Sequence, residues 1–275
     1  MRRTAQLFIP RRAAATTVTI PPPRQLLPPH LQKLEVDDNV YTTSEAHLST
    51  FLAKHRAGLL QTLAHRCLTA FSSKSDFDVN GLLNMYPLFL FSEVQLQALL
   101  QRATGDTKVV GRGLDIGSGC GNVTDTLRSV CADLTTTETS PVMAAKLREN
   151  GYDCWCEDVS STYQQREERF RLVSMLNVID RTPRPATLFK AASTLLEDGG
   201  YLLLATPLPF RPFYFTADHA TASPSLSSRR KHAQPLESLG LSKDGKWEDQ
   251  AEKLLSQVRT HHIPTFSSLL HDTMT

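Results

Sequence analysis

Hydrophobic residues between positions 109 and 205 fall into two kinds of segment that alternate along the chain. Short apolar runs bounded by Gly, Asp or Asn are typical of strands. Between them, apolar residues recur every three or four positions, which predicts helices with one buried face. The predicted strands are 109–116, 132–137, 152–156, 170–176 and 201–205, and the predicted helices are 123–130, 141–150 and 186–196. This alternation favours the α/β class, with a doubly wound, Rossmann-like parallel sheet.

Two helices are predicted before this core and one after it. An amphipathic pattern covers residues 44–71, a second helix starts at Ser92, and a third follows Trp247. Residues 216–246 show no period and are rich in Ser, Ala, Lys and Arg, so we expect a flexible surface loop there. The predicted parts are a disordered basic, Pro-rich tail (1–40), an N-terminal helical segment (41–105), the core (106–215), the loop (216–246), and a C-terminal helix and tail (247–275).

The 275-residue chain carries a net charge of +2, and its distribution is uneven. Six basic residues precede the first acid, Glu35, which leaves 24 basic against 28 acidic residues in the rest. A mildly acidic body does not favour nucleic acid as a partner, and no apolar run is long enough to span a bilayer. An intracellular, cytoplasmic protein is the default expectation. Because the Arg-rich start resembles a transit peptide, import into an organelle is the alternative.

The five cysteines are few and irregularly spaced, so reduced thiols are expected. Cys154 and Cys156 have neither a second cysteine pair nor a nearby His to complete a metal site, and no metal is predicted.

The candidate chemistry begins with glycines directly after the first predicted strand. Gly117, Gly119 and Gly121 stand at alternate positions, where glycine permits a sharp turn into a helix and a close approach of the backbone to a ligand. Glu138 ends the second predicted strand, where a carboxylate can accept both ribose hydroxyls of a nucleotide-like cofactor.

The spacing of the glycines narrows the cofactor. A dinucleotide fingerprint needs its third glycine three positions after the second, and here the interval is two. An anionic Asp115 before the loop repels phosphate but suits the positively charged amino-acid end of S-adenosylmethionine. The pattern therefore predicts a methyltransferase loop, with a glycine turn in an unrelated sheet protein as the alternative.

Methyl transfer needs a nucleophile held in line with the methyl group, and residues after the fourth strand of such a sheet face the reacting end of the cofactor. Asn177 and Asp180 lie there, and the alternative is that they cap the next helix. After the fifth strand, Pro209, Phe210 and Pro212 form either an apolar wall for the substrate or a plain turn at the sheet edge.

Three segments give the chain a more specific resemblance. Residues 175–181 (Met-Leu-Asn-Val-Ile-Asp-Arg), 208–213 (Leu-Pro-Phe-Arg-Pro-Phe) and 80–83 (Asn-Gly-Leu-Leu) are similar to those of the DREV family of methyltransferases. The resemblance implies a protein-histidine methyltransferase that modifies the pros nitrogen in His-x-His sequences of protein substrates. It also implies that Asp158 flanks the adenine and that Asn177 and Asp180 form the active-site pair.

The chemistry of histidine agrees with these expectations. A carboxylate that accepts the one N–H of a neutral imidazole fixes its tautomer, so the other nitrogen keeps a free lone pair. Beyond the matched part we expect the last strands of the family's sheet to be missing, as in a shortened product. The alternatives are a small-molecule methyltransferase and a catalytically impaired scaffold that binds S-adenosylmethionine.

Overall fold

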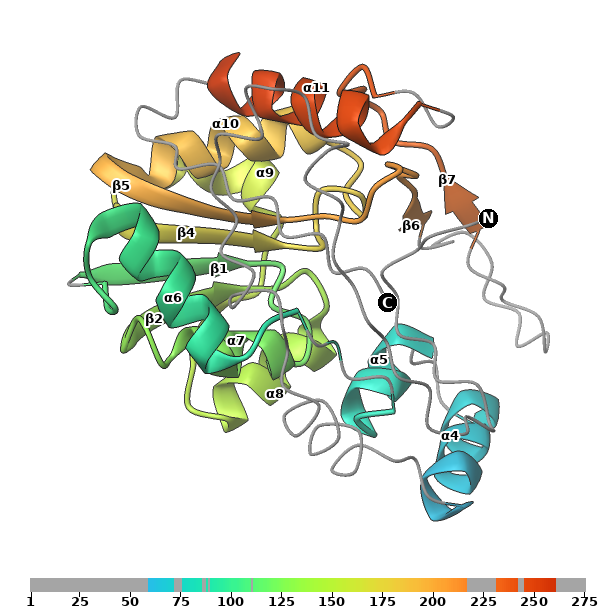
Figure 1. The fold of residues 1–275 in the computed structure, drawn as a ribbon. Coiled ribbons are helices and arrows are strands. Elements are labelled where there is room, and N and C mark those ends of the chain that lie inside the picture. The colour runs from blue at the N-terminus through green and yellow to red at the C-terminus, as the bar shows by residue number, and fades with distance from the viewer. Residues whose placement is uncertain are drawn as a thin grey trace, which may run out of the picture.

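A computed structural model describes residues 59–71, 76–85, 88, 90–109, 111–216, 231–241 and 245–260. Its centre is a parallel five-stranded sheet with the order β3-β2-β1-β4-β5 (Figure 1). The strands are β1 (Arg112–Ile116), β2 (Asp133–Thr137), β3 (Asp153–Trp155), β4 (Phe170–Leu176) and β5 (Leu196–Ala205). The predicted doubly wound sheet is thereby confirmed.

Helices cover both faces of the sheet. On one face lie α6 (Glu93–Thr104), α7 (Asn122–Leu127) and α8 (Pro141–Glu149), and on the other lie α9 (Val159–Thr162), α10 (Pro185–Leu195) and α11 (Trp247–Thr260). A short 3-10 helix, η2 (Tyr163–Gln165), follows α9. The expected helix at 44–71 corresponds to α4 (Leu59–Phe71), since 44–58 lie outside the described residues, and α5 (Asp76–Leu82) follows it.

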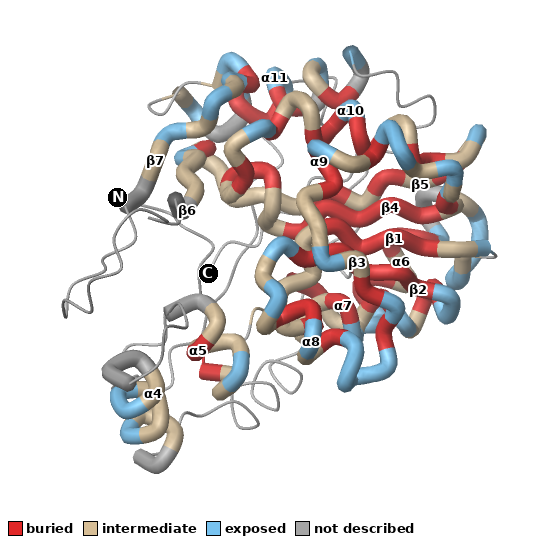
Figure 2. The backbone as a smooth tube through the Cα atoms, turned by 180° about the vertical axis from the view of Figure 1, so that it is seen from behind, coloured by how far each residue is buried: buried red, intermediate tan, exposed pale blue. Residues whose placement is uncertain are grey.

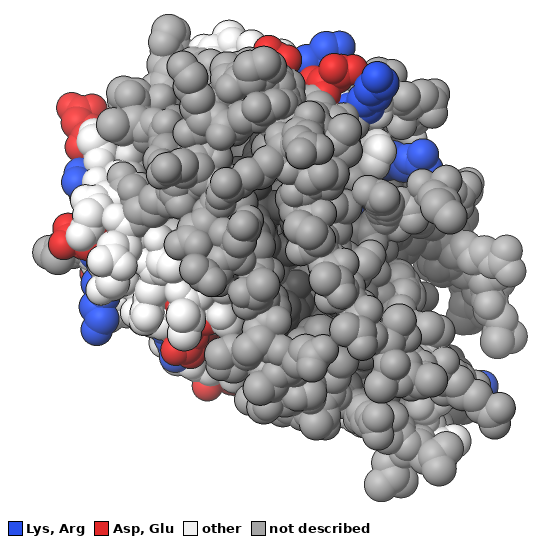
Figure 3. All heavy atoms as spheres, in the orientation of Figure 1, with Lys and Arg blue, Asp and Glu red and all other residues white. Residues whose placement is uncertain are grey.

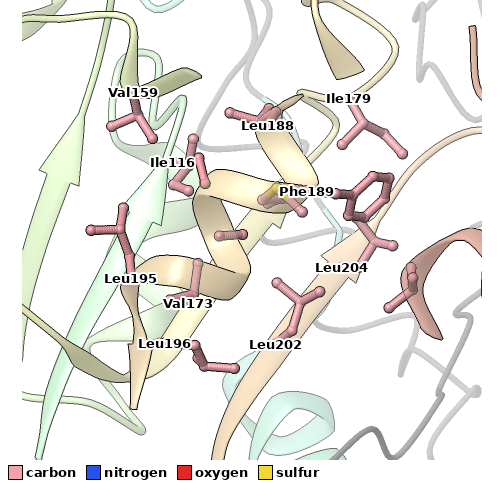
Figure 4. Packing of buried hydrophobic residues seen from close by; sticks show 14 of the residues in the cluster. Ile116, Val159, Val173, Ile179, Leu188, Phe189, Leu195, Leu196, Leu202 and Leu204 are labelled. Atoms are coloured by element: carbon pink, nitrogen blue, oxygen red, sulfur yellow. The ribbon is translucent and has the colours of Figure 1, made fainter. Parts of the chain in front are cut away.

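The apolar side chains form two clusters, one on each face of the sheet. Figure 2 shows the inner strands as the most continuously buried part of the backbone. In the larger cluster, Val173, Leu202 and Leu204 of the sheet pack beneath Leu188 and Phe189 of α10 (Figure 4). Burial of these faces is the main stabilising contribution to the fold.

Local signals fix the ends of several helices. Ser92 caps α6 in a reciprocal pair with Gln95, the Ser92 N–H donating to Gln95 Oε1 (2.8 Å). Ser140 caps α8, and Pro141 occupies its first turn as predicted. These caps orient α6 and α8 at the face of the sheet where the glycine loop begins.

The structure differs from expectation at the start of β5. The strand was expected to begin at residue 201, but β5 begins at Leu196 and includes Asp198, Gly199 and Gly200. The register to β4 shifts here, because Phe170 pairs with Leu196 whereas Leu172 pairs with Tyr201. Gly199 has a φ of 70° within this irregular stretch, a conformation that glycine adopts without the steric penalty of a side chain.

The expected flexible loop also differs in its described part. Strand β7 (Lys231–Ala233) pairs antiparallel with β6 (Tyr214–Thr216), and Leu239 is buried in the larger cluster. Glu237 accepts hydrogen bonds from the N–H (2.8 Å) and hydroxyl (2.5 Å) of Thr187 at the start of α10. Residues 231–241 are thus packed against the core.

No helix among the described ranges has both the length and the apolar character needed to cross a membrane. On the face shown in Figure 3, charged side chains of both signs lie interspersed around the rim.

Candidate active site

The predicted site residues gather at the carboxyl ends of the strands. Asp115 precedes the turn after β1, Glu138 follows β2 and Asn177 follows β4. In an open parallel sheet this edge is where ligands bind. Figure 1 shows α5 and β6 beyond the same end of the sheet.

The glycine loop has the backbone that its sequence predicts. Gly117, Gly119 and Gly121 have φ values of 73°, 58° and 91°, which side chains disfavour. A Cβ on Gly117 would lie 2.6 Å from Cγ2 of Val178, and one on Gly121 would lie 3.2 Å from Cδ2 of Leu147. The loop is therefore held between the segment after β4 and helix α8.

Asp115 lies beneath the loop. Only 2% of the residue is exposed, and its carboxylate oxygens accept hydrogen bonds from the hydroxyls of Ser174 (2.6 Å) and Thr124 (2.7 Å). Burial raises the pKa of the carboxyl above its usual range, and the hydroxyls oppose that shift. Asp115 thus joins β1 to β4 and α7 under the loop. In the sequence, the one signal for this role is the hydroxyl residue Ser174 within a mostly apolar strand.

Glu138 faces the loop from the end of β2. Its Oε2 accepts the N–H of Gly119 (2.9 Å) and its Oε1 accepts the N–H of Ser140 (2.9 Å). Burial, which leaves 7% of the residue exposed, raises the pKa of this carboxyl. A carboxylate has about four acceptor positions, so Glu138 keeps capacity for a hydroxyl while it holds the loop.

Asp158 lies after β3 and begins α9. Its Oδ1 accepts from the N–H (3.0 Å) and hydroxyl (2.7 Å) of Ser160, so the side chain caps this short helix. The predicted contact with adenine remains an expectation.

Helix α5 covers the loop from the N-terminal side, which sequence reasoning did not predict. Ser140 Oγ donates to Asp78 Oδ1 (2.5 Å), and Asn122 Nδ2 donates to Asn84 Oδ1 (3.0 Å). Lys146 Nζ also donates to the carbonyl of Gly81, where a Cβ would lie 2.4 Å from Sδ of Met143. The glycine within the 80–83 segment was the one available signal for such a close approach.

Asn177 and Asp180 do not cap the following helix. Helix α10 starts at Pro185 after Arg184, and no side chain caps it. Asn177 instead adopts a φ of 55°, and its N–H donates to the carbonyl of Ala205 (2.8 Å). A positive φ at a non-glycine residue is a strained conformation that concentrates at functional sites.

Asp180 is buried and its two carboxylate oxygens differ. Oδ2 forms an ion pair with Nη1 of Arg181 (2.6 Å), whereas Oδ1 has no hydrogen-bond partner among the described residues. Burial raises the pKa of the carboxyl to about 6, although the charge of Arg181 acts in the opposite direction. Burial also lowers the pKa of Arg181, whereas the negative charge of Asp180 acts to raise it.

Two further buried polar atoms, Oδ1 of Asn80 on α5 and Oγ1 of Thr206 after β5, lack a partner within the described ranges. Buried polar atoms are almost always paired in folded proteins, so orphaned atoms call for an explanation such as a ligand. Sequence reasoning missed Thr206, which follows the predicted fifth strand directly.

The segment after β5 differs from expectation. Phe210 was expected to form part of either an apolar wall for the substrate or a plain turn, and its 2% exposure within the larger apolar cluster argues against the wall. Pro209 follows a cis peptide bond and, like Pro212, is half-buried. Phe213, three residues further, approaches the site instead, because its N–H donates to the carbonyl of Asp180 (3.0 Å) and its ring lies 4.0 Å from the guanidinium of Arg181.

No group of three or more His, Cys, Asp or Glu side chains that could hold a metal ion gathers within the described part of the chain.

A parallel sheet of this order, with a glycine turn after β1 and an acid after β2, is a Rossmann-like fold of the kind that binds a nucleotide-like cofactor. The sequence model of the DREV methyltransferase family matches residues 24–263. The chain belongs to this family.

Curated relatives match over a shorter part of the chain. Ubiquinone biosynthesis O-methyltransferase of Serratia proteamaculans (strain 568) is 26% identical over 156 residues, which cover 53% of this chain and 62% of that protein. The same enzyme of Photorhabdus laumondii is 26% identical over 137 residues, covering 47% and 55%. The chain thus spans less than two thirds of the length of these relatives.

Among solved structures, SAM-bound CalS10, an amino pentose methyltransferase from Micromonospora echinaspora, is 20% identical with a TM-score of 0.36, covering 55% of this chain and 59% of that one. The N-methyltransferase NodS from Bradyrhizobium japonicum in complex with S-adenosyl-L-homocysteine is 20% identical with a TM-score of 0.34, covering 40% and 59%.

S-adenosylmethionine is the cofactor of this site. The residues present fit it, since the loop allows a close backbone approach at Gly117 and Gly121, and the Glu138 carboxylate stands beside Gly119 with acceptor capacity left. Glu138 would take the ribose hydroxyls.

Proposed function

We propose that this chain is a protein-histidine N-methyltransferase that transfers a methyl group from S-adenosylmethionine to the pros nitrogen of histidine in His-x-His sequences. The observation that carries the proposal is the carboxylate of Asp180. It lies buried at the carboxyl edge of β4, with one oxygen paired to Arg181 and the other unpartnered.

An unpartnered, buried carboxylate oxygen suits a substrate that brings a single N–H. Neutral imidazole has one N–H and one lone pair, and if Oδ1 accepts the Nε2–H, Nδ1 presents its lone pair for attack. A raised pKa of about 6 leaves Asp180 mainly ionised at neutral pH, so it can act as this acceptor.

S-adenosylmethionine, held by the glycine loop and Glu138, would supply a methyl group on a positively charged sulfur, and the rest of the cofactor would leave as a neutral thioether. The protein orients the imidazole so that Nδ1 forms the new N–C bond while the S–C bond breaks and the sulfur takes the electron pair. The substrate ring becomes a cation, and the negative charge of Asp180 stabilises that charge as it develops. The Nε2 proton is then lost by way of Asp180 to solvent.

Asn177 lies three residues before Asp180 in a strained conformation. Its side chain belongs to the same turn after β4, where it can orient the substrate or the amino-acid end of the cofactor.

The experiment is methylation of a His-Ala-His peptide by the parent chain and by Asp180→Asn, with methyl-labelled cofactor. The substitution removes the charge and replaces one acceptor oxygen by a donor, so the rate should fall by about a hundredfold or more, as for other single electrostatic contacts to a transition state. Cofactor affinity should stay unchanged, since Asp180 faces the substrate. Equal rates for the two proteins would overturn the proposed role of Asp180.

The curated relatives favour a second candidate, because they are O-methyltransferases of ubiquinone biosynthesis. A small phenolic acceptor in the same assay separates the two, since turnover of the phenol without turnover of the peptide would favour the small-molecule reading. Cofactor binding without turnover of either would favour a scaffold.

A further inference from the structure

We propose that Arg181 is a positioning residue, which together with Phe213 holds the Asp180 carboxylate so that only Oδ1 is presented to the substrate imidazole. This inference rests on the proposed function and adds to it the residue that orients the Asp180 carboxylate and favours its ionised form.

Arg181 is fixed by three separate contacts. Its Nη1 lies 2.6 Å from Asp180 Oδ2 and donates to the Asp180 carbonyl at 2.9 Å. Its guanidinium carbon lies 4.0 Å from the centre of the Phe213 ring, a cation–π distance. One nitrogen thus holds both the side chain and the main chain of the neighbouring residue, and the ring supports the group from its flat face.

Phe213 completes the arrangement from the segment between β5 and β6. Its N–H donates to the same Asp180 carbonyl (3.0 Å), so the segment after β5 is joined to the segment after β4 at the candidate acceptor. Arg181 is only partly buried, with 29% of its side chain exposed, whereas the Asp180 side chain is 2% exposed. The arginine therefore covers Oδ2 from the solvent side, and the aromatic ring limits its movement.

The form of the ion pair argues against a purely structural role. Arginine and carboxylate commonly pair in a bidentate manner that satisfies both oxygens. Here a single nitrogen approaches a single oxygen, and the buried Oδ1 is left without a partner among the described residues. A pair that served stability alone would gain from satisfying that oxygen.

Other charged groups near this edge have partners elsewhere. Asp115 is bound by Ser174 and Thr124, Glu237 by Thr187, and Arg184 donates to Ser161 (3.0 Å), while Arg211 is exposed. The charge of Arg181 lowers the pKa of Asp180, against the effect of burial.

The test compares Arg181→Met, Arg181→Lys and the matched control Arg184→Met in two measurements on the full chain. The first is the pH dependence of kcat/KM on the His-Ala-His peptide. Loss of a nearby positive charge raises a carboxyl pKa by about one to three units, so the acid limb should move upward by about that amount in Arg181→Met. The limb should stay in place in Arg181→Lys and Arg184→Met, and the peptide's own imidazole contributes equally to all profiles.

The lysine variant separates charge from orientation. It keeps the charge but loses the planar group that stacks on Phe213, so kcat should fall several-fold without a shift of the acid limb. An acid limb of Arg181→Met at the parent position would overturn the inference, whatever the loss of rate, because a residue needed only for folding does not move that limb.

The second measurement needs no turnover. The ¹³C resonance of the Asp180 carboxyl, assigned by its loss in Asp180→Asn, is titrated in each protein without cofactor. Its midpoint should rise in Arg181→Met alone, and an unchanged midpoint would overturn the pairing. Absence of methylation by the parent chain at every pH would instead contradict the proposed function.

Discussion

At the scale of single residues, the burial of Asp180 makes the stability of the folded protein depend on pH. Its pKa is raised to about 6, so between pH 4 and 6 the folded state binds a proton that the unfolded state has released. Stability contributed by this group is therefore greatest below pH 4 and declines as the pH rises through 6. A shift of about two pKa units corresponds to roughly 2 to 3 kcal/mol of unfolding free energy lost at neutral pH.

We expect Asp180→Asn to remove this pH dependence. Relative to the parent, the variant should gain on the order of 2 to 3 kcal/mol between pH 4 and 7.5, measured by urea unfolding at several pH values. Arg181 stays charged throughout this range, so the loss of its partner shifts the unfolding free energy by the same amount at every pH and does not change its dependence on pH. The exposed Asp153→Asn is the control, and parallel pH profiles for Asp180→Asn and the parent would contradict the prediction.

Glu138 is expected both to bind the cofactor and to hold the glycine loop, and one substitution tests both roles. We expect Glu138→Ala to weaken S-adenosylmethionine binding by about 1.5 to 3 kcal/mol, the range for a lost charge-assisted hydrogen bond at a buried position. The N–H groups of Gly119 and Ser140 lose their acceptor as well, so the loop loosens. Titration calorimetry measures the affinity, with the exposed Glu149→Ala on α8 as control. Unchanged affinity in Glu138→Ala would remove the ribose assignment.

At the scale of elements, the glycine loop and the turn after β4 meet closely at Gly117 and Val178. A methyl group on Gly117 would collide with Cγ2 of Val178 at 2.6 Å, and it would also strain the positive φ. Gly151 has a similar φ of 80° but nothing within 4 Å of an added Cβ.

We expect Gly151→Ala to cost about 1 to 2 kcal/mol of stability, the penalty for a side chain in this conformation, with cofactor affinity unchanged. Gly117→Ala should cost more and should also weaken both cofactor binding and turnover, because Val178 must move and lies between Asn177 and Asp180. Thermal unfolding and calorimetry on both variants provide the comparison. Equal effects of the two substitutions would show that the collision has no functional consequence.

The elements also show what sequence could predict. Strand β4 was predicted with its observed bounds, because five of its seven residues are apolar and the run lies between the polar residues Arg169 and Asn177. Strands β6 and β7 were missed, since three-residue strands that pair across a long interval carry no periodic signal. Phe210 was misplaced because nothing in its local sequence shows that α11 supplies the partner of its N–H. The role of Arg181 was not predicted, because its contacts with Asp180 and Phe213 exist only in the folded chain.

At the scale of the whole molecule, the last described helix supports the site from the far side of the sheet. In α11, Gln250 is 1% exposed, and its Oε1 accepts the N–H of Phe210 (2.6 Å) while its Nε2 donates to the carbonyl of Gly245 (2.8 Å). Leu254 and Val258 of the same helix belong to the larger apolar cluster. The segment that carries Phe213 to Asp180 is thus anchored at Phe210 by a helix that comes much later in the chain.

We expect Gln250→Leu to destabilise the protein by about 1 to 3 kcal/mol, because it leaves the buried N–H of Phe210 without an acceptor. The same change should lower kcat on the His-Ala-His peptide more than it alters cofactor affinity, since the loosened segment contacts Asp180 and Arg181 but not the glycine loop. Gln257→Leu, a half-buried position on the same helix, is the matched control in urea unfolding and in the activity assay. If Gln250→Leu loses stability but keeps the parental kcat, α11 anchors the core without reaching the site, and the line of contacts from Gln250 through Phe210 to Phe213 has no part in catalysis.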